Sequence, residues 1–248
     1  MKTALVTGAA RGIGLATTRV LLDAGWRVAM LDRDQDQLCK AAKELEVVQV
    51  VVADVSDPDQ VTRALAEVTE AFCTLDGLVN NAGVADFGVL QATTFERWRR
   101  VMATNLDGPF LMVQAFADLL ADGGGSVVNI TSISGLRAST LRVAYGTSKA
   151  ALAHLTLQQA VELGERGIRV NAVAPGPVDT KLALAVHTPD IRAAYHDAIP
   201  LNRYGQEHEI AAVIAFLLSD AASYVTGQIL AADGGFAATG IGLPSLRQ

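Results

Sequence analysis

The sequence has little of several features that would point to particular classes of protein. Its 248 residues include only two cysteines, Cys39 and Cys73, which lie far apart in the chain. Two scattered thiols do not make a disulfide framework or a metal site. We therefore expect inert cysteines, no bound metal and a reducing, cytoplasmic setting.

A basic surface and a long hydrophobic segment are also missing. Acidic residues outnumber basic ones by 26 to 20, and the formal net charge of −6 argues against a broad nucleic-acid-binding surface. The longest apolar stretch, residues 211–218, is well short of the roughly 20 residues that span a bilayer. The apolar run at residues 4–6 is too short for a signal peptide. We expect neither nucleic acid nor a membrane as a partner.

The sequence does contain a regular alternation of strand-like and helix-like segments. The strand-like segments are continuous apolar runs such as Val50–Val52, which are typical of strands buried on both faces. We expect strands near residues 3–7, 27–32, 47–53, 75–80, 125–131, 168–174 and 227–231, and helices near 12–24, 34–45, 58–72, 94–121, 145–166 and 208–219. The alternation predicts a single α/β domain over residues 1–248, a doubly wound Rossmann fold with a seven-stranded parallel sheet flanked by helices on both faces. A TIM barrel shows the same alternation, but a glycine-rich turn after the first strand argues against it.

That glycine-rich turn lies between the first strand and the first helix. Gly8, Gly12 and Gly14 allow a tight turn and close approach of the backbone to a ligand, and the start of the helix offers free N–H groups to a pyrophosphate. The pattern is G-x-x-x-G-x-G rather than the general G-x-G-x-x-G, so its place between a strand and a helix carries the interpretation. It predicts a dinucleotide site that also includes Arg11 and Ile13.

The end of the second strand indicates which dinucleotide binds. Asp32 lies 18 residues after Gly14, close to the spacing of about 20 for an acid that holds the adenosine ribose. A carboxylate accepts hydrogen bonds from the ribose hydroxyls and repels a 2′-phosphate, which favours NAD over NADP. Arg11 and Arg33 argue weakly for NADP, since a guanidinium binds phosphate, although both also fit as solvated charges. We expect NAD as the cofactor.

Two further strand ends carry polar residues. Asp54 and Val55 follow the third strand, where the adenine edge would lie, and they fit the start of a helix at residues 56–58 equally well. Residues 80–83, Asn-Asn-Ala-Gly, end the fourth strand and also suit an ordinary turn.

A possible proton-transfer site lies in the second half of the chain. Lys149 follows Tyr145 by four residues, so the two share one face of a helix. The reference pKa of a phenol is about 10, and a neighbouring positive charge lowers it. Ser132, thirteen residues before Tyr145, would hold a substrate oxygen. The three side chains together predict proton transfer to or from an alcohol or a carbonyl.

The ordered set of these motifs resembles the short-chain dehydrogenase/reductase family. The resemblance extends from Thr3 to about Gly235, and the motifs that carry it are the glycine-rich turn, Asp54, residues 80–83, Asn105, Ser132, Tyr145 with Lys149, and Pro175-Gly176. It implies hydride transfer between a nicotinamide and a carbinol carbon, in a protein whose cofactor half is about residues 1–130 and whose catalytic and substrate half is about 131–248.

The resemblance also implies a role for each matching residue. Tyr145 would be the general acid/base, Lys149 would lower its pKa and hold the nicotinamide ribose, and Ser132 would bind the substrate oxygen. Asn105 would help to hold Lys149 through a water and a local helix kink. The implied cofactor-binding residues are Gly8, Arg11, Gly12, Ile13, Gly14, Asp32, Arg33, Asp54, Val55, Asn81, Ala82, Gly83, Tyr145, Lys149, Pro175, Gly176, Val178 and Thr180.

The substrate end is less well defined by the sequence. The resemblance implies a lid at about residues 180–203, in which we expect His187 and His196 to be surface residues. The expected substrate residues are Ser132, Ser134, Arg142 and Tyr145. Polar residues in this region suggest a small polyol, a sugar or a hydroxy acid, while Leu136, Leu141 and Val143 would equally line an acyl or steroid pocket.

Two other functions fit parts of the sequence. An NADPH-dependent 3-oxoacyl thioester reductase would need a basic docking patch for an acidic carrier protein, for which the candidates are Arg97, Arg99, Arg100, Arg137 and Arg142. A catalytically silent nucleotide-binding scaffold would not need Ser132, Tyr145 and Lys149, which are all present.

The resemblance implies a homotetramer, paired through the long fourth and fifth helices. Apolar residues that would pack within or between subunits are Trp98, Val101, Met102, Leu152, Leu155, Leu157 and Val161. The C-terminal stretch from Gly234 to Gln248 is expected to cover the lid or to cross to a neighbour.

Overall fold

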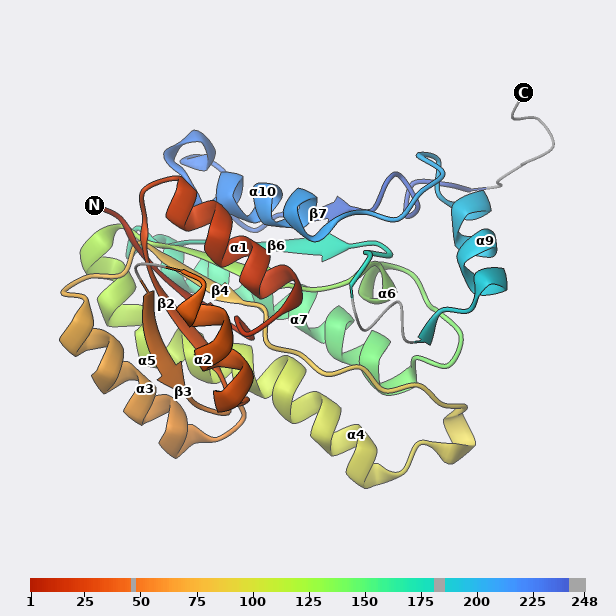
Figure 1. Cartoon of the computed structure of the whole chain (residues 1–248), viewed down its shortest axis with the longest axis horizontal. Helices are drawn as coiled ribbons and strands as arrows, with labels where there is room; N and C mark the ends of the chain where they lie inside the picture. The colour runs from red at the N-terminus through yellow and green to blue at the C-terminus, as the bar shows by residue number, and fades with distance from the viewer. Residues whose placement is uncertain (46–47, 181–185, 241–248) are drawn as a thin grey trace.

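A parallel sheet of seven strands forms the centre of the structure, as the sequence predicts (Figure 1). The computed structural model describes residues 1–45, 48–180 and 186–240. The strands are β1 (Thr3–Thr7), β2 (Arg27–Asp32), β3 (Val48–Val52), β4 (Gly77–Asn80), β5 (Ser126–Ile130), β6 (Arg169–Pro175) and β7 (Ile229–Ala232). They lie in the order β3-β2-β1-β4-β5-β6-β7, so the chain reverses its direction of winding beside β1. In such sheets ligands bind at the carboxyl ends of the strands near this switch point.

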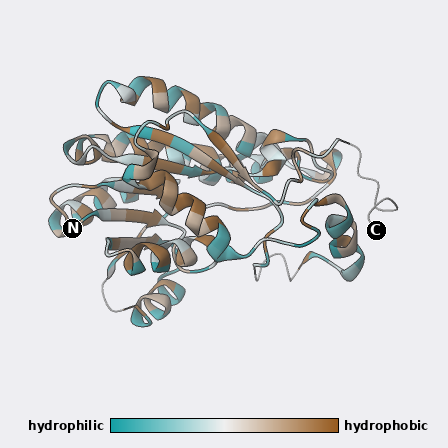
Figure 2. Cartoon of the chain, turned by 90° about the horizontal axis from the view of Figure 1, so that it is seen from above, coloured by the Kyte–Doolittle hydropathy of each residue, from teal (hydrophilic) through white to brown (hydrophobic). Residues whose placement is uncertain are grey.

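Helices cover both faces of the sheet, which explains why its strands are mostly apolar. On one face, α1 (Gly12–Asp23), α2 (Gln35–Lys43) and α10 (Glu207–Leu218) pack on a core that includes Leu21, Leu38 and Ile214. On the other face, α3 (Pro58–Ala71), α5 (Gly108–Gly123) and α7 (Val143–Gly164) pack on a core that includes Phe116 and Val170. Figure 2 shows hydrophobic residues concentrated along the strands between these two layers.

Local signals in the sequence fix where several helices begin and end. The carboxylate of Asp34 accepts a hydrogen bond from the backbone N–H of Gln37 at the start of α2. Asp57 does the same for Asp59 at the start of α3, where Pro58 occupies the first turn. Gly124 ends α5 at a φ of 64°, in the left-handed region that favours glycine.

The segment expected as one helix over residues 94–121 is instead interrupted. It consists of α4 (Phe95–Met102), a π-helical turn (Ala103–Asp107) and α5. Two short helices, α6 (Ile133–Leu136) and α9 (Pro189–Ala198), lie in segments where no helix was predicted. No residue of α9 is fully buried, so the helix has no apolar stripe that would reveal it. Within the described part of the chain, no helix is long and apolar enough to cross a membrane.

Candidate active site

The glycine-rich turn between β1 and α1 leaves no room for side chains. A Cβ atom on Gly14 would lie 2.3 Å from the carbonyl oxygen of Gly8, and one on Gly8 would lie 2.8 Å from the Cα of Ala82. Gly8 and Gly12 both have a φ of 62°, which most other residues adopt only with strain. No side chain caps the first turn of α1, which begins at Gly12 and includes Ile13, so its N–H groups face the turn. Such a cradle fits a pyrophosphate.

Asp32 at the end of β2 faces the expected adenosine side of this cradle. One carboxylate oxygen accepts a hydrogen bond from the N–H of Ala10 at 3.1 Å, and the other accepts from the N–H of Asp34 at 3.0 Å. These bonds hold the carboxylate beside the glycine turn. Its position fits a group that binds ribose hydroxyls.

The two arginines at this end are both paired with carboxylates. Arg11 forms an ion pair with Asp34, and Arg33 forms one with Asp54 at 3.2 Å. A backbone hydrogen bond from Gln37 and the bond from Arg11 lower the pKa of Asp34. Neither guanidinium is therefore free to serve a 2′-phosphate without first breaking its pair.

Asp54 and Val55 differ in their surroundings. Burial raises the pKa of Asp54, but hydrogen bonds from Ser56 and Arg33 outweigh this effect and lower it overall. Asp57 is the N-cap of α3 and the helix begins at Pro58, as the helix-start interpretation of this segment expects. Val55 is buried against Gly108, where a Cβ atom would come within 2.7 Å of its side chain.

Asn81 after β4 joins this strand end to the glycine turn. Its side-chain amide donates to the carbonyl oxygens of Thr7 at 2.9 Å and Gly8 at 3.1 Å, and the N–H of Ala82 donates to the hydroxyl of Thr7 at 3.0 Å. Gly83 then approaches the catalytic centre, since a Cβ atom there would lie 3.5 Å from Nζ of Lys149. Asn81 thus positions the cradle through hydrogen bonds within the protein.

Asn105 lies in the π-helical turn and is fully buried. Its side chain accepts from the N–H of Val84 at 2.8 Å and donates to the carbonyl of Val84 at 2.9 Å. It also donates to the hydroxyl of Ser148 at 3.1 Å, and Ser148 in turn donates to the carbonyl of Tyr145 at 2.7 Å. Asn105 therefore links the loop after β4 to the helix that carries Tyr145 and Lys149.

The Lys149 side chain is enclosed beside Tyr145. Its Nζ donates to the carbonyl oxygen of Ile130 at 2.7 Å and lies 5.9 Å from the centre of the Tyr145 ring. Burial lowers the pKa of Lys149 to about 8. The amine is therefore partly uncharged at slightly alkaline pH.

The structure corrects our expectation for Tyr145. Burial raises the pKa of its phenol, whereas we expected a lowered value. A hydrogen bond from Ser132 and the charge of Arg142 act in the opposite direction but do not outweigh burial. Proximity to Lys149 was visible in the sequence, but the enclosure of the phenol was not.

The substrate residues expected from the sequence lie at the start of α6 and of α7. Ser132 ends the loop after β5, is buried, and accepts a hydrogen bond from the N–H of Ser134 at 3.1 Å. The Ser134 hydroxyl lies 3.4 Å from that of Ser139. The guanidinium of Arg142 lies 4.4 Å from the centre of the Phe87 ring and 5.4 Å from that of Tyr145. No sequence signal pointed to Phe87.

The expected cofactor-binding residues at the end of β6 and just after it differ in how they are buried and what they contact. Pro175 ends the strand, and Gly176 lies so close to Asp233 that a Cβ atom would come within 2.7 Å of its Cα. Val178 is buried in the core beneath α10, and the N–H of Thr180 donates to its carbonyl at 2.8 Å. Burial of Val178 makes it a support for this loop more than an exposed cofactor contact.

Part of the expected lid, residues 181–185, lies outside the described residues. The rest contains α9, and here His187 and His196 are not simple surface residues as expected. The Nδ1 atom of His187 lies 3.0 Å from the Tyr204 hydroxyl, its ring stacks on Tyr195, and the His196 ring packs edge-on against Tyr204. Burial lowers the pKa of His187, as do Arg142 and Arg192. The histidine and tyrosine residues of this cluster are dispersed in the sequence, so no spacing pattern predicts that they pack together.

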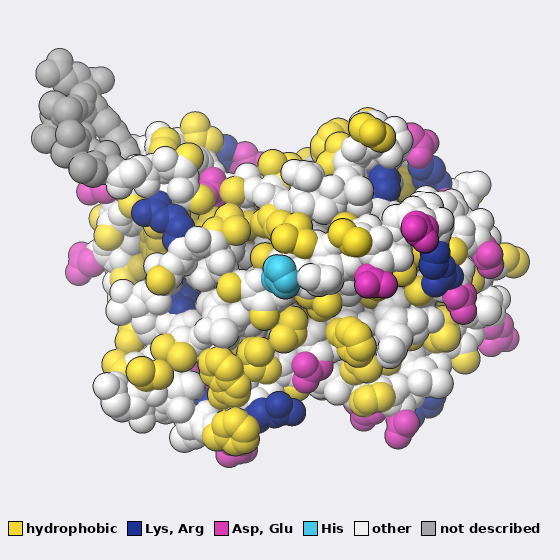
Figure 3. All heavy atoms as spheres, turned by 180° about the vertical axis from the view of Figure 1, so that it is seen from behind, with side chains coloured by type: hydrophobic (Ala, Val, Ile, Leu, Met, Phe, Trp, Pro, Cys, Tyr) yellow, Lys and Arg dark blue, Asp and Glu magenta, His cyan; other side chains and the backbone are white. Residues whose placement is uncertain are grey.

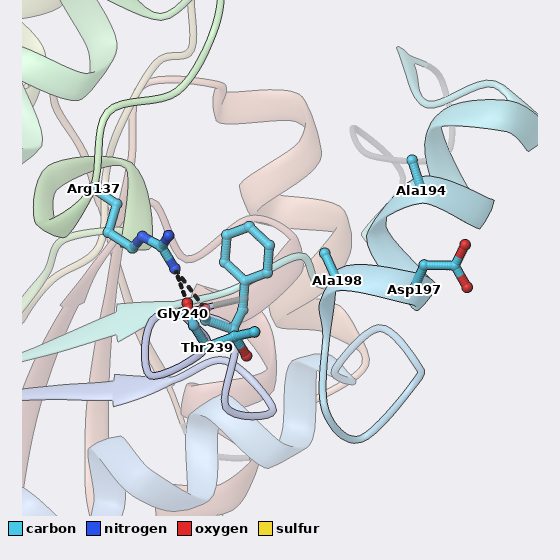
Figure 4. Close-up of a pocket in the computed structure, with 7 residues that line it drawn as sticks. Arg137, Ala194, Asp197, Ala198, Thr239 and Gly240 are labelled. Carbon is cyan, nitrogen blue, oxygen red and sulfur yellow. Dashed lines mark hydrogen bonds between the residues drawn. The ribbon is translucent and has the colours of Figure 1, made fainter. Parts of the chain in front are cut away.

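A hollow of about 290 Å³ lies beside this region, between α9 and the C-terminal segment (Figure 4). Arg137 extends from the end of α6 and donates to the carbonyl oxygens of Phe236 at 3.0 Å and Thr239 at 2.9 Å. Phe236 also packs 6.0 Å from the Tyr195 ring. The C-terminal segment thus contacts the end of α6 through Arg137 and contacts α9 through Phe236, while the rest of the C-terminal stretch, including Ile241 and Leu243, is outside the described residues.

Comparisons with known proteins agree with this fold and site. A family model described as "Enoyl-(Acyl carrier protein) reductase" matches residues 8–237. The chain is 43% identical over 239 residues to galactitol 2-dehydrogenase (L-tagatose-forming) from Cereibacter sphaeroides, covering 94% of each chain. It is 38% identical over 239 residues to a 3-oxoacyl-[acyl-carrier-protein] reductase from Thermotoga maritima, covering 94% of this chain and 97% of the other. The crystal structure of levodione reductase superposes with a TM-score of 0.91 at 33% identity, covering 96% of this chain and 98% of the other.

These similarities extend over nearly the whole chain. The chain belongs to the short-chain dehydrogenase/reductase family. It is an oxidoreductase of the class that acts on CH–OH groups with a nicotinamide dinucleotide.

Proposed function

We propose that the chain interconverts a secondary alcohol and a ketone with NAD(H), with Tyr145 as general acid/base. The substrate is of small polyol, sugar or hydroxy-acid type. The observation that carries the proposal is the convergence of Ser132, Tyr145 and Lys149 at the carboxyl end of β5, next to a glycine cradle that fits a pyrophosphate. Asn105 supports this group through Ser148.

Each side chain has a defined task in this proposal. Ser132 hydrogen-bonds the substrate oxygen, and Tyr145 takes the hydroxyl proton during oxidation or returns it during reduction. The Lys149 ammonium steadies the phenolate, since an adjacent positive charge favours the charged form of the phenol. Hydride transfer is the chemistry that a bound nicotinamide supplies. Because burial raises the pKa of Tyr145, the phenol is a base only when positive charge is near it.

The choice of NAD over NADP rests on the charges around the adenosine end. Asp32, Asp34 and Asp54 face Arg11 and Arg33 there, and each arginine already has a carboxylate partner. A 2′-phosphate would meet an excess negative charge. We expect kcat/KM to be at least roughly tenfold higher with NAD⁺ than with NADP⁺, and Asp32→Ser to narrow that ratio, because about 1.4 kcal/mol corresponds to a tenfold effect.

The similarity to a 3-oxoacyl-[acyl-carrier-protein] reductase supports a second candidate function. The contacts that the arginines of the expected docking patch make in the structure argue against this function. Arg97 and Arg100 are both paired with Asp86, and Arg137 donates to a carbonyl oxygen of the C-terminal segment. These guanidinium groups bind acceptors within the protein and would have to leave them to contact an acidic carrier protein.

One experiment tests the proposed function against this alternative. Reduced nicotinamide is followed by its absorbance while NAD⁺ or NADP⁺ is offered with polyols, sugars, hydroxy acids, hydroxyacyl thioesters and hydroxysteroids. The proposal expects NAD⁺-dependent oxidation of a small hydroxylated compound. Turnover confined to hydroxyacyl thioesters with NADP⁺ would favour the reductase, and nucleotide binding without any turnover would favour a silent scaffold.

A further inference from the structure

Arg142 is a positive charge at the catalytic centre that has no carboxylate partner among the described residues. Its guanidinium lies between the rings of Phe87 and Tyr145, at 4.4 and 5.4 Å from their centres. The ion pairs found in residues 1–45, 48–180 and 186–240 involve Arg97, Arg100 and Arg192 in this region, but not Arg142. The stacking fixes where the guanidinium lies without neutralising it.

The other charges near Arg142 do not compensate it. Asp86 precedes Phe87, but it is buried and accepts hydrogen bonds from both Arg97 and Arg100, which hold its pKa low. The two guanidinium groups and the one carboxylate together carry a net positive charge. On the other side, Arg192 is paired with Asp179 at 2.8 Å. The field at Arg142 therefore favours an anion.

The influence of Arg142 reaches the reacting groups. Its charge opposes the burial effect on the pKa of Tyr145 and contributes to the lowered pKa of His187. The charge of Arg142 therefore acts both on the acid/base and on His187 in the segment before α9.

The backbone holds Arg142 in this place. The N–H of Gly88 donates to the carbonyl of Leu141 at 3.1 Å, and Gly88 pairs with Arg142 in an isolated parallel bridge. Leu141 has a φ of 62°, in the left-handed region that residues other than glycine seldom adopt. Strained backbone of this kind persists where the surroundings enforce it, and it is concentrated at functional sites.

We propose that Arg142 binds a carboxylate of the substrate, so that the preferred substrates are short hydroxy acids and the corresponding keto acids. The proposal rests on the proposed function, because it places the carbinol at Tyr145. A guanidinium binds a carboxylate through two parallel hydrogen bonds, which fixes orientation as well as charge. Phe87 holds the plane of the guanidinium in advance, so little side-chain entropy is lost on binding. A neutral polyol would leave the charge without a partner.

Matched pairs of acid and ester test this proposal. 3-Hydroxybutyrate and its methyl ester are compared for oxidation with NAD⁺, and levulinate and its methyl ester for reduction with NADH. The variants are Arg142→Met, which keeps an apolar stem against Phe87, and Arg142→Lys, which keeps the charge but loses the planar fork. Arg166→Met, just beyond the far end of α7, removes the same charge and is the control.

We expect the wild type to prefer each acid over its ester, and Arg142→Met to lower kcat/KM for the acids by about a hundredfold, because the substrate carboxylate would lose its charged partner. The esters should change by no more than about threefold. Arg142→Lys should recover part of the loss, and Arg166→Met should behave as the wild type. Equal losses for acid and ester in Arg142→Met, or no preference for the acids in the wild type, would overturn the proposal.

A binding measurement separates this proposal from the proposed function. Levulinate and its ester are titrated calorimetrically into the enzyme saturated with NADH. Levulinate binding that is lost in Arg142→Met but kept in Arg166→Met supports the anion site even if none of the compounds is turned over. Equal affinity of both variants for levulinate, or no levulinate binding to the wild type, overturns the anion site even if neutral alcohols are good substrates.

Discussion

At the scale of single residues, a substitution of Tyr145 should lower turnover without weakening cofactor binding. Tyr145→Phe keeps the ring between Arg142 and Lys149 but removes the hydroxyl that would exchange the proton. We expect turnover to fall about 10²- to 10⁴-fold, the usual contribution of a general acid or base, while the Kd for NADH stays within roughly twofold. Single-turnover rates and a fluorescence titration measure the two quantities. Turnover close to that of the wild type would refute the role of Tyr145.

Lys149 makes stability depend on pH in a defined direction. Its pKa is about 8 in the folded protein and 10.5 in its ordinary state, so the unfolded chain binds more protons between these values and stability rises with pH across this window. The shift corresponds to a cost on the order of 3 kcal/mol below pH 8. The stability of Lys149→Met relative to the wild type should therefore be highest below pH 8 and should decline towards pH 10.5. Chemical denaturation at several pH values tests this, with exposed Lys43→Met as the control.

Single residues also show how far the sequence could predict the site. The four-residue spacing of Tyr145 and Lys149 was visible because a helix brings such positions together. The raised pKa of Tyr145 was not, since it depends on enclosure by distant elements. The stacking of Arg142 on Phe87 joins residues 55 positions apart, and only the folded chain brings them into contact.

At the scale of elements, the turn between β1 and α1 depends on Gly14. An alanine there would place its Cβ 2.3 Å from the Gly8 carbonyl oxygen and 2.6 Å from the Asn81 amide, so the turn must open. We expect Gly14→Ala to raise the Kd for NADH at least roughly tenfold and to lower the melting temperature. The control is Gly164→Ala at the end of α7, which meets no atom within 4 Å and should gain up to about 1 kcal/mol of stability from helix propensity. Unchanged NADH affinity in Gly14→Ala would contradict the cradle.

The elements that the sequence did not predict share a physical cause. The π-helical turn at residues 103–107 lies in an apolar helical pattern, and its irregularity arises from the bonds that Asn105 makes to Val84 and Ser148. α9 is held by contacts of Tyr195 with His187 and Phe236 rather than by an apolar face. In both cases tertiary contacts, not local periodicity, decide the structure.

At the scale of the whole molecule, the parallel sheet could be predicted because its strands are mostly apolar and helical segments alternate with them along the chain. The assembly could not, since the same helices serve the core of the protomer. Val101 and Leu152, which we considered for contacts within or between subunits, are fully buried within the protomer. Leu157 and Val161 are exposed by 37% and 77%. Apolar side chains are also visible on the face shown in Figure 3.

We propose that these exposed residues of α7, with Phe110 of α5, pair subunits in a homotetramer. A charge placed there would be buried without a partner on association, which is strongly unfavourable. Val161→Glu should therefore shift the sedimentation coefficient from that of a tetramer to that of a smaller species, while melting of the isolated protomer changes little because the side chain is exposed. Thr69→Glu adds the same charge to the exposed surface of α3 and should leave the tetramer intact. A monomeric wild type would refute the assembly, and a Val161→Glu variant that sediments as the wild type does would place the subunit contact elsewhere on the molecule.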